Sequence, residues 1–217
     1  MPATRPTLRA YASRPLETHH GKATHRIDGD HVRFPLLEGR AAGPQVGRRA
    51  HDLYTTPEWA TLILLRHLPS DLGRVLEPCA GDGAIASVIR HHATKLVTND
   101  LDHSHSGELH FDATQPWPTL PGPKLNWVIT NPPFRAAAGI LRQALCRCPN
   151  VELLLRLSFM EPTADRGGLV AEAPPSKLVV LPRRSFTGTG KTDSATSAWM
   201  FWSPLVDRGI VVEPQKR

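Results

Sequence analysis

The chain has 217 residues, of which 40% are hydrophobic and 21% are charged, a balance typical of a globular domain with a sizeable core. No apolar run approaches the roughly 20 residues that cross a membrane, and the first residues lack the apolar segment of a secretory signal. The three cysteines are too few for a disulfide framework or a zinc site, and no histidine belongs to a recognisable ligand cluster. We therefore expect a cytoplasmic protein that contacts no membrane and binds no metal.

The net charge of +6 is concentrated near the N-terminus. Residues 1–50 hold nine Arg and Lys against four Asp and Glu, with many Pro, Gly and His and no sustained hydrophobic period. This composition predicts a flexible basic arm over 1–50, ahead of a folded domain over 51–217. The arm could contact a polyanion such as nucleic acid or could be a solvated tail, and its composition leaves both open.

From residue 51 onward, helical and strand patterns alternate. Apolar residues at helical spacing, behind a proline suited to a first turn, predict a helix over 57–68. Further helices are predicted over 81–92 and 134–148, and strands over 73–78, 94–100, 108–114, 125–131, 151–159, 177–182 and 197–203. Continuous apolar strands between helices indicate a mostly parallel, seven-stranded sheet covered on both faces. A polar loop joins the last two strands, so the final strand is expected to be antiparallel.

Polar side chains end the first four predicted strands: Glu77, Asp100, Asp112 and Asn131. Ligands of such sheets bind beyond the carboxyl ends of the strands, so these residues define a candidate site. After the first strand, Gly81 and Gly83 form a G-x-G turn that lets a ligand approach the backbone. Asp100 could pair with ribose hydroxyls, with Leu101 offering an apolar face to an adenine, and Asp102 is the alternative carboxylate.

The stretch "NPPF", residues 131–134, ends the fourth strand with a stiff segment that is poor in donors. The side-chain oxygen of Asn131 and the carbonyl of Pro132 could both accept hydrogen bonds from an amino group. Pro133 keeps the segment extended, and the ring of Phe134 suits stacking on a flat base. These four residues are the catalytic candidates.

A polar loop over 182–196 mixes glycines with basic residues and one aromatic, which suits contact with nucleic acid. Its candidate contacts are Arg183, Arg184, Phe186 and Lys191. An ordinary solvated hairpin is the alternative reading. The "GTGKT" within the loop is not a phosphate-binding loop of a nucleotide triphosphatase, because Ser185 stands where glycine is required and no helix follows.

The motifs "EPCAGDGAIA", "TNDLD", "FDAT" and "TNPPF", in that order, resemble the successive motifs of S-adenosylmethionine-dependent amino-methyltransferases. "DLYTTPEWA" upstream and "RLSFME" and "SAWMFW" downstream extend the likeness over roughly residues 51–203. The small phage-type adenine-N6 DNA methyltransferases are the most similar group. The resemblance implies a Rossmann-like class I methyltransferase fold.

The same resemblance assigns the cofactor S-adenosylmethionine, with S-adenosylhomocysteine as product. It implies that Tyr54, Thr55 and Pro57 line the methionine end and that Glu77 and Gly81 lie near its amino group. Asp100 would hold the ribose and Asp112 the adenine. The further implied cofactor-binding residues are Pro78, Ala80, Gly83, Leu101, Ala113 and Asn131.

The implied activity is methyl transfer to the exocyclic N6 amino group of adenine in DNA, after base flipping. Little of the chain is left for a separate target-recognition region, so recognition should be short or loose. One alternative is an N-methyltransferase that acts on RNA or on a protein glutamine amide. A second alternative, from a different class, is an inactive protein that binds the cofactor and nucleic acid.

Overall fold

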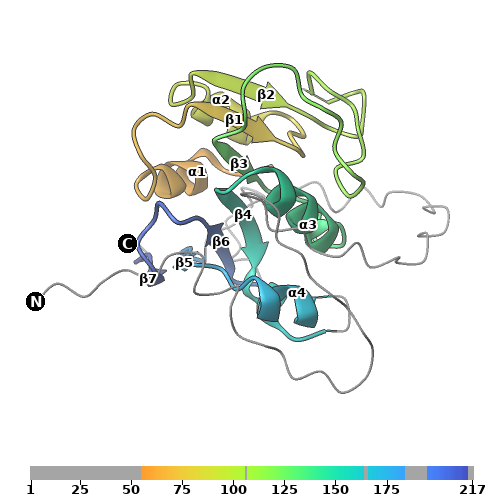
Figure 1. The fold of residues 1–217 in the computed structure, drawn as a ribbon. Coiled ribbons are helices and arrows are strands. Elements are labelled where there is room, and N and C mark those ends of the chain that lie inside the picture. The colour runs from red at the N-terminus through yellow and green to blue at the C-terminus, as the bar shows by residue number, and fades with distance from the viewer. Residues whose placement is uncertain (1–54, 106, 164–165, 184–194, 215–217) are drawn as a thin grey trace, which may run out of the picture. The chain divides into compact units, whose positions relative to one another are not determined.

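The computed structural model describes residues 55–105, 107–163, 166–183 and 195–214 (Figure 1). The helices are α1 (Glu58–Leu65), α2 (Ala84–Ile89), α3 (Ala137–Arg147) and α4 (Gly167–Glu172), with a short 3-10 helix, η2 (Leu157–Met160). The strands are β1 (Arg74–Glu77), β2 (Lys95–Thr98), β3 (Trp127–Thr130), β4 (Val151–Arg156), β5 (Lys177–Val180), β6 (Ser197–Trp202) and β7 (Gly209–Val212). No helix in these ranges combines the length and the apolar character needed to cross a membrane.

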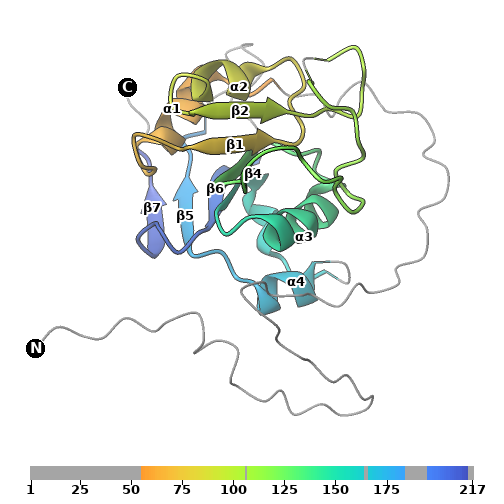
Figure 2. The same ribbon diagram turned by 45° about the horizontal axis from the view of Figure 1, so that its top comes forward.

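The strands form one sheet in the order β2-β1-β3-β4-β6-β5-β7. The pairs β1–β2, β1–β3, β3–β4 and β5–β7 are parallel, whereas β6 is antiparallel to both β4 and β5. Strand direction turns progressively across the sheet from β2 to β7, as the normal twist of strands requires (Figure 2). The predicted fold class, a mostly parallel seven-stranded sheet with an antiparallel strand at 197–203, is confirmed.

Two predicted strands are wrong in extent. The segment 108–114 contributes only one isolated bridge, between Asn99 and Leu109. Its backbone groups bond to a side chain instead of to a neighbouring strand. The Phe111 N–H donates to Asn99 Oδ1 (2.8 Å), and the Phe111 carbonyl accepts from Asn99 Nδ2 (3.0 Å). The predicted strand 151–159 ends at Arg156, where the chain tightens into η2.

The seventh strand is β7, at the edge of the sheet beyond β5. Four residues long, it pairs only with β5, and its side chains Ile210 and Val212 are 71% and 70% exposed. Its side chains lack the burial that marks the inner strands, so the sequence pattern did not indicate it.

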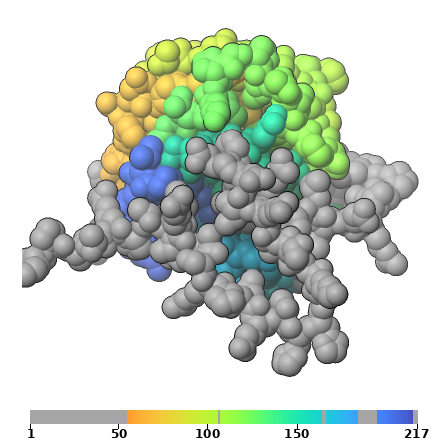
Figure 3. All heavy atoms as spheres, in the orientation of Figure 1, coloured from red at the N-terminus to blue at the C-terminus, as the bar shows by residue number. Residues whose placement is uncertain are grey.

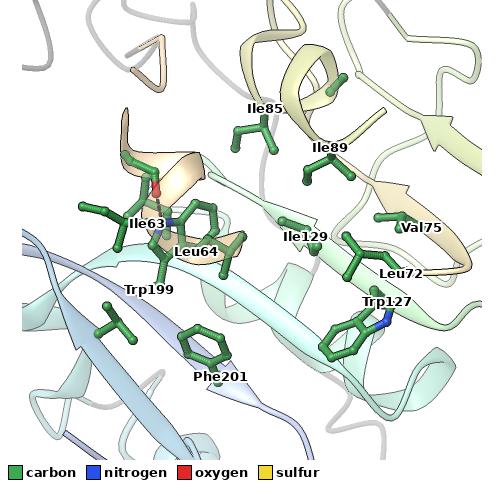
Figure 4. Close-up of a cluster of buried hydrophobic side chains, with 14 of the residues drawn as sticks. Ile63, Leu64, Leu72, Val75, Ile85, Ile89, Trp127, Ile129, Trp199 and Phe201 are labelled. Atoms are coloured by element: carbon green, nitrogen blue, oxygen red, sulfur yellow. Dashed lines mark hydrogen bonds between the residues drawn. The ribbon is translucent and has the colours of Figure 1, made fainter. Parts of the chain in front are cut away.

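Helices cover both faces of the sheet. On one face, α1 and α2 pack their apolar residues against the strands, around the fully buried Leu64, Trp199 and Phe201 (Figure 4). Trp199 is also bonded there, because its Nε1 donates to the Ala60 carbonyl of α1 (2.8 Å). On the other face, α3 and α4 pack against a second cluster that includes Phe159. With its faces covered, the sheet leaves its strand ends to form a site.

Candidate active site

The carboxyl ends of β1, β2 and β3 lie side by side. Parallel pairing matches Glu77 with Thr98 and Leu76 with Val128, so the residues that follow each strand emerge at the same edge. In the space-filling view, the orange to green residues, which include α1, α2 and the loops after β1 and β2, form one continuous surface (Figure 3). This edge gathers the glycine turn, the segment around Asp100 and the "NPPF" segment.

The glycine turn after β1 depends on two left-handed residues. Gly81 has φ 54° and Gly83 has φ 81°, a region that residues with a Cβ rarely adopt. Gly83 is the residue before α2, and the exposed Asp82 between the glycines accepts the Ala84 N–H at Oδ1 (3.2 Å). The turn thus keeps bare backbone at the edge of the sheet, where a ligand can approach closely.

Asp100 joins β2 to this turn. Its Oδ2 accepts the Gly81 N–H (2.8 Å), while its Oδ1 accepts the Asp102 N–H (2.9 Å) and lies 3.2 Å from His105 Nδ1. Asp102 instead closes a local turn, since its Oδ1 accepts both the N–H and the hydroxyl of Ser104 (3.0 and 2.7 Å). Of the two carboxylates weighed for the ribose, Asp100 is therefore the one at the glycine turn.

Leu101, the neighbour of Asp100, is a large apolar residue that is 53% exposed. A side chain of this kind at a strand end costs free energy unless something covers it. Its exposure beside Asp100 matches the apolar face that an adenine ring needs.

Asn99 holds the loop that carries Asp112. Besides its two bonds with Phe111, it donates Nδ2 to the Pro78 carbonyl (2.9 Å), so one buried amide links the loops after β1 and β2. Asp112 caps the following turn, where its Oδ1 accepts the N–H (2.9 Å) and hydroxyl (2.7 Å) of Thr114. The carboxyl group of Asp112 therefore lies close to the first two strand ends.

Glu77 is buried beneath the glycine turn, with 1% of its surface exposed. Burial raises the pKa of its carboxyl well above the usual value. The hydrogen bond from the Ala86 N–H lowers this pKa, whereas the negative charges of Asp82 and Asp100 raise it further. Its Oε2 has no hydrogen-bond partner among the described residues. A buried acceptor without a donor is costly, and a cationic ligand group at the turn would satisfy it.

A short segment before α1, Thr55-Thr56, joins the glycine turn to the "NPPF" segment; we call it the strap. Thr55 donates its hydroxyl to Asp82 Oδ2 (2.5 Å). The buried Thr56 accepts at Oγ1 from Asn131 Nδ2 (3.0 Å). Because an amide has donor and acceptor on opposite ends, this bond turns the Asn131 Oδ1 away from Thr56.

The "NPPF" segment leaves β3 as an extended, donor-poor stretch. Pro132 is buried and Pro133 and Phe134 are half-buried. The Pro133 carbonyl accepts the Ala136 N–H at the start of α3 (2.9 Å), whereas no described residue donates to the carbonyl of Pro132. The guanidinium groups of Arg156 and Arg166 lie over the Phe134 ring.

Two hollows in the described surface are not lined by the polar residues at the strand ends. One of about 430 Å³ is lined by Gly73, Arg74 and the 121–123 segment, at the amino ends of the strands. Another of about 530 Å³ lies between α1 and α2 and includes the strap, but none of Asp100, Asp112 and Asn131. The candidate site is therefore defined by the convergence of its residues at the strand ends.

Some predicted residues lie outside the described part of the chain, namely Tyr54, Arg184, Phe186 and Lys191. Arg183 is exposed just beyond β5, and Trp59 packs against the α1–α2 core. Pro57 directly precedes α1 rather than occupying its first turn. Pro78, Ala80 and Ala113 are buried beside the strand ends. Within the described residues, no group of three His, Cys, Asp or Glu could hold a metal ion.

The residues present fit S-adenosylmethionine. The unpartnered Glu77 oxygen would meet an ammonium group, and the left-handed glycines leave room for it. The exposed Leu101 would cover a purine. Sequence reasoning missed the strap residue Thr56, the linker Asn99, and Arg156 and Arg166. Thr56, Asn99 and Arg156 lay within recognised motifs, which did not assign them a role, and Arg166 carried no local signal.

No protein-family model and no curated protein matches the chain. Among solved structures it is similar to a modification subunit of a type I restriction enzyme from Vibrio vulnificus YJ016. The TM-score is 0.55, the sequence identity is 12%, and 76% of this chain is covered. It is also similar to the type I restriction-modification methyltransferase subunit from Streptococcus thermophilus, with TM-score 0.51, 11% identity and 78% covered. The chain spans about half of each, 48% and 49%. At these identities the likeness concerns the fold, and the described domain has the Rossmann-like fold of these methyltransferase subunits.

Proposed function

We propose that this chain transfers a methyl group from S-adenosylmethionine to the N6 amino group of adenine in DNA, after the base is flipped out of the helix. The single observation that carries the proposal is the bond between Thr56 and Asn131 (3.0 Å). It fixes an amide acceptor next to a glycine turn of the kind that binds the cofactor.

An exocyclic amino nitrogen is a poor nucleophile, because its lone pair is delocalised into the ring. During methylation the nitrogen becomes tetrahedral and positive. The Oδ1 of Asn131 and the carbonyl of Pro132 would accept its two N–H bonds and stabilise that charge as it develops. Fixed acceptors of this kind need no reorganisation during the reaction.

The cofactor, when bound, would supply a methyl group on a positively charged sulfur. Glu77, Gly81 and Asp100 would hold it at the glycine turn, and Phe134 would stack on the flipped base. Together they align nitrogen and methyl carbon for direct transfer. With the cofactor bound, transfer would form the N–C bond as the S–C bond broke with its electron pair left on sulfur, and the acidic ammonium product would lose its proton to water.

The basic residues near the N-terminus and Arg183 support a nucleic-acid substrate rather than a glutamine amide. We propose that the arm over 1–50 and the 182–196 loop, with Arg184, Phe186 and Lys191, contact DNA around the flipped base. RNA is the competing substrate, and the experiment below separates the two.

The test is incubation with labelled S-adenosylmethionine and unmethylated duplex DNA, with an RNA pool in a parallel reaction, followed by digestion to nucleosides and mass spectrometry. We expect N6-methyladenine from DNA. Asn131→Ala should abolish it while retaining cofactor binding by calorimetry, and Gln143→Ala, which removes an amide on α3, should leave it unchanged. Label on RNA alone would overturn the DNA assignment. Cofactor binding without transfer to either nucleic acid would refute catalysis.

A further inference from the structure

The ring of Phe134 lies beneath two positive charges. The Arg156 Cζ is 5.7 Å from the ring centroid and the Arg166 Cζ is 5.3 Å from it, both within cation–π range. Arg156 is the last residue of β4, and Arg166 immediately precedes α4. Two elements from the later part of the chain therefore converge on the residue proposed to stack on the target base.

Arg166 is held firmly in this arrangement. Its Nε donates to Thr163 Oγ1 (2.9 Å), and one terminal nitrogen donates to the Ser158 carbonyl (2.8 Å). The same guanidinium lies 5.6 Å from the ring centroid of Phe159, which is fully buried. Arg166 thus connects Phe134 to the core, and its role is to position the ring.

Arg156 lies in a different environment from Arg166. Its side chain is exposed, and within the described residues it makes no ion pair and no hydrogen bond. Its guanidinium group makes a cation–π contact with the ring of Phe134. A guanidinium group with five donors, held over the stacking residue and paired with no carboxylate of the described residues, is suited to bind an anion of the substrate.

We propose that Arg156 binds a backbone phosphate next to the flipped nucleotide. The inference rests on the proposed function and adds a contact to it. A base that is flipped onto Phe134 swings about its own backbone, so the flanking phosphates come close to the groups that surround the ring. A guanidinium binds a phosphate through two parallel hydrogen bonds, which fixes orientation as well as distance. Arg156 therefore sets the register of the strand at the reacting nucleotide.

The test compares Arg156→Gln with Arg90→Gln. Arg90 is exposed at the end of α2, and since α2 runs back from the carboxyl ends of the strands, it lies toward the opposite edge. Each variant loses one exposed positive charge. The probe is a fluorescein-labelled oligo(dA) of about 12 nucleotides, a single strand in the range of known site sizes that needs no base flipping.

Fluorescence anisotropy measures affinity between about 50 and 200 mM salt. We expect Arg156→Gln to weaken binding about 3- to 10-fold at low salt and to reduce the slope of log K against log salt by about 0.7. Arg90→Gln should change neither, and Arg156→Lys should restore the slope but not the full affinity. Equal slopes for wild type and Arg156→Gln, in proteins with unchanged thermal unfolding, would overturn the proposal. Binding requires no methyl transfer, so a failure of the proposed activity would be seen separately, in the methylation assay.

Discussion

Glu152 is buried in the middle of β4, where it pairs with Ile129 of β3 and Phe201 of β6 and shares their apolar face of the sheet. It is 0% exposed, and neither carboxyl oxygen has a hydrogen-bond partner among the described residues. Burial raises the pKa of this carboxyl well above the usual value. The folded protein therefore keeps Glu152 protonated under conditions in which the unfolded chain ionises it.

The pKa of Glu152 is higher in the folded than in the unfolded chain, and this difference sets the sign of the pH dependence of stability. Stability contributed by a raised carboxyl pKa is fully present below the unfolded pKa and is lost as pH rises toward the folded one. In that interval the loss is about 1.4 kcal/mol per pH unit. Replacing Glu152 with Met removes both the titration and the unpartnered oxygens, so the variant should be more stable by an amount that grows with pH, at most by about 1.4 kcal/mol per pH unit.

The assay is urea unfolding of wild type, Glu152→Met and Glu152→Gln between about pH 5.5 and 7.5. The Gln variant should share the altered pH dependence without the full gain in stability, because its amide is still polar and unpartnered. Glu172→Gln, at an exposed site on α4, should follow wild type. A pH-independent difference between wild type and Glu152→Met would refute the reasoning, because it would mean that Glu152 has the same charge in both states.

Three shorter predictions concern other contacts. Thr56→Val removes the acceptor of the Asn131 amide and should lower kcat about 10-fold, with the cofactor affinity unchanged within about 2-fold. Thr56→Ser keeps the hydroxyl and should restore kcat. An equal loss of kcat in both variants would refute the role of Thr56 in holding Asn131. Trp199→Phe leaves the Ala60 carbonyl without its indole donor and opens a small cavity, so urea unfolding should show a loss of about 2–3 kcal/mol. Gly83→Ala adds a Cβ at φ 81° and should cost about 1–2 kcal/mol and weaken cofactor binding, both measurable by denaturation and calorimetry.

The parts of the molecule that sequence predicted are those with a local cause. The turn at Gly81 and Gly83 is recognisable because two glycines follow an apolar run, and the extended segment at Pro132 because proline restricts its own backbone and that of its neighbour. The alternation of strands and helices likewise needs only neighbouring residues. These local patterns were sufficient for six of the seven strands, β1 to β6.

The parts that were missed depend on distant residues. Thr56 and Asn131 are 75 positions apart, and only the folded sheet brings them together. The segment 108–114 has a strand-like pattern, yet the side chain of Asn99 takes the bonds that a ladder would have used. Arg166 reaches Phe134 from the segment between η2 and α4, two elements that the sequence did not predict.

The strap has a mechanical consequence. The described domain begins at Thr55 and Thr56, the residues that bond to Asp82 and Asn131, so the chain before them is joined directly to the proposed catalytic segment. A force applied to the N-terminal part of the protein, by a bound partner or by a fused tag, would reach the Asn131 amide before it reached any core residue. Activity would then respond to that load while the fold, secured by its two buried clusters, kept its stability.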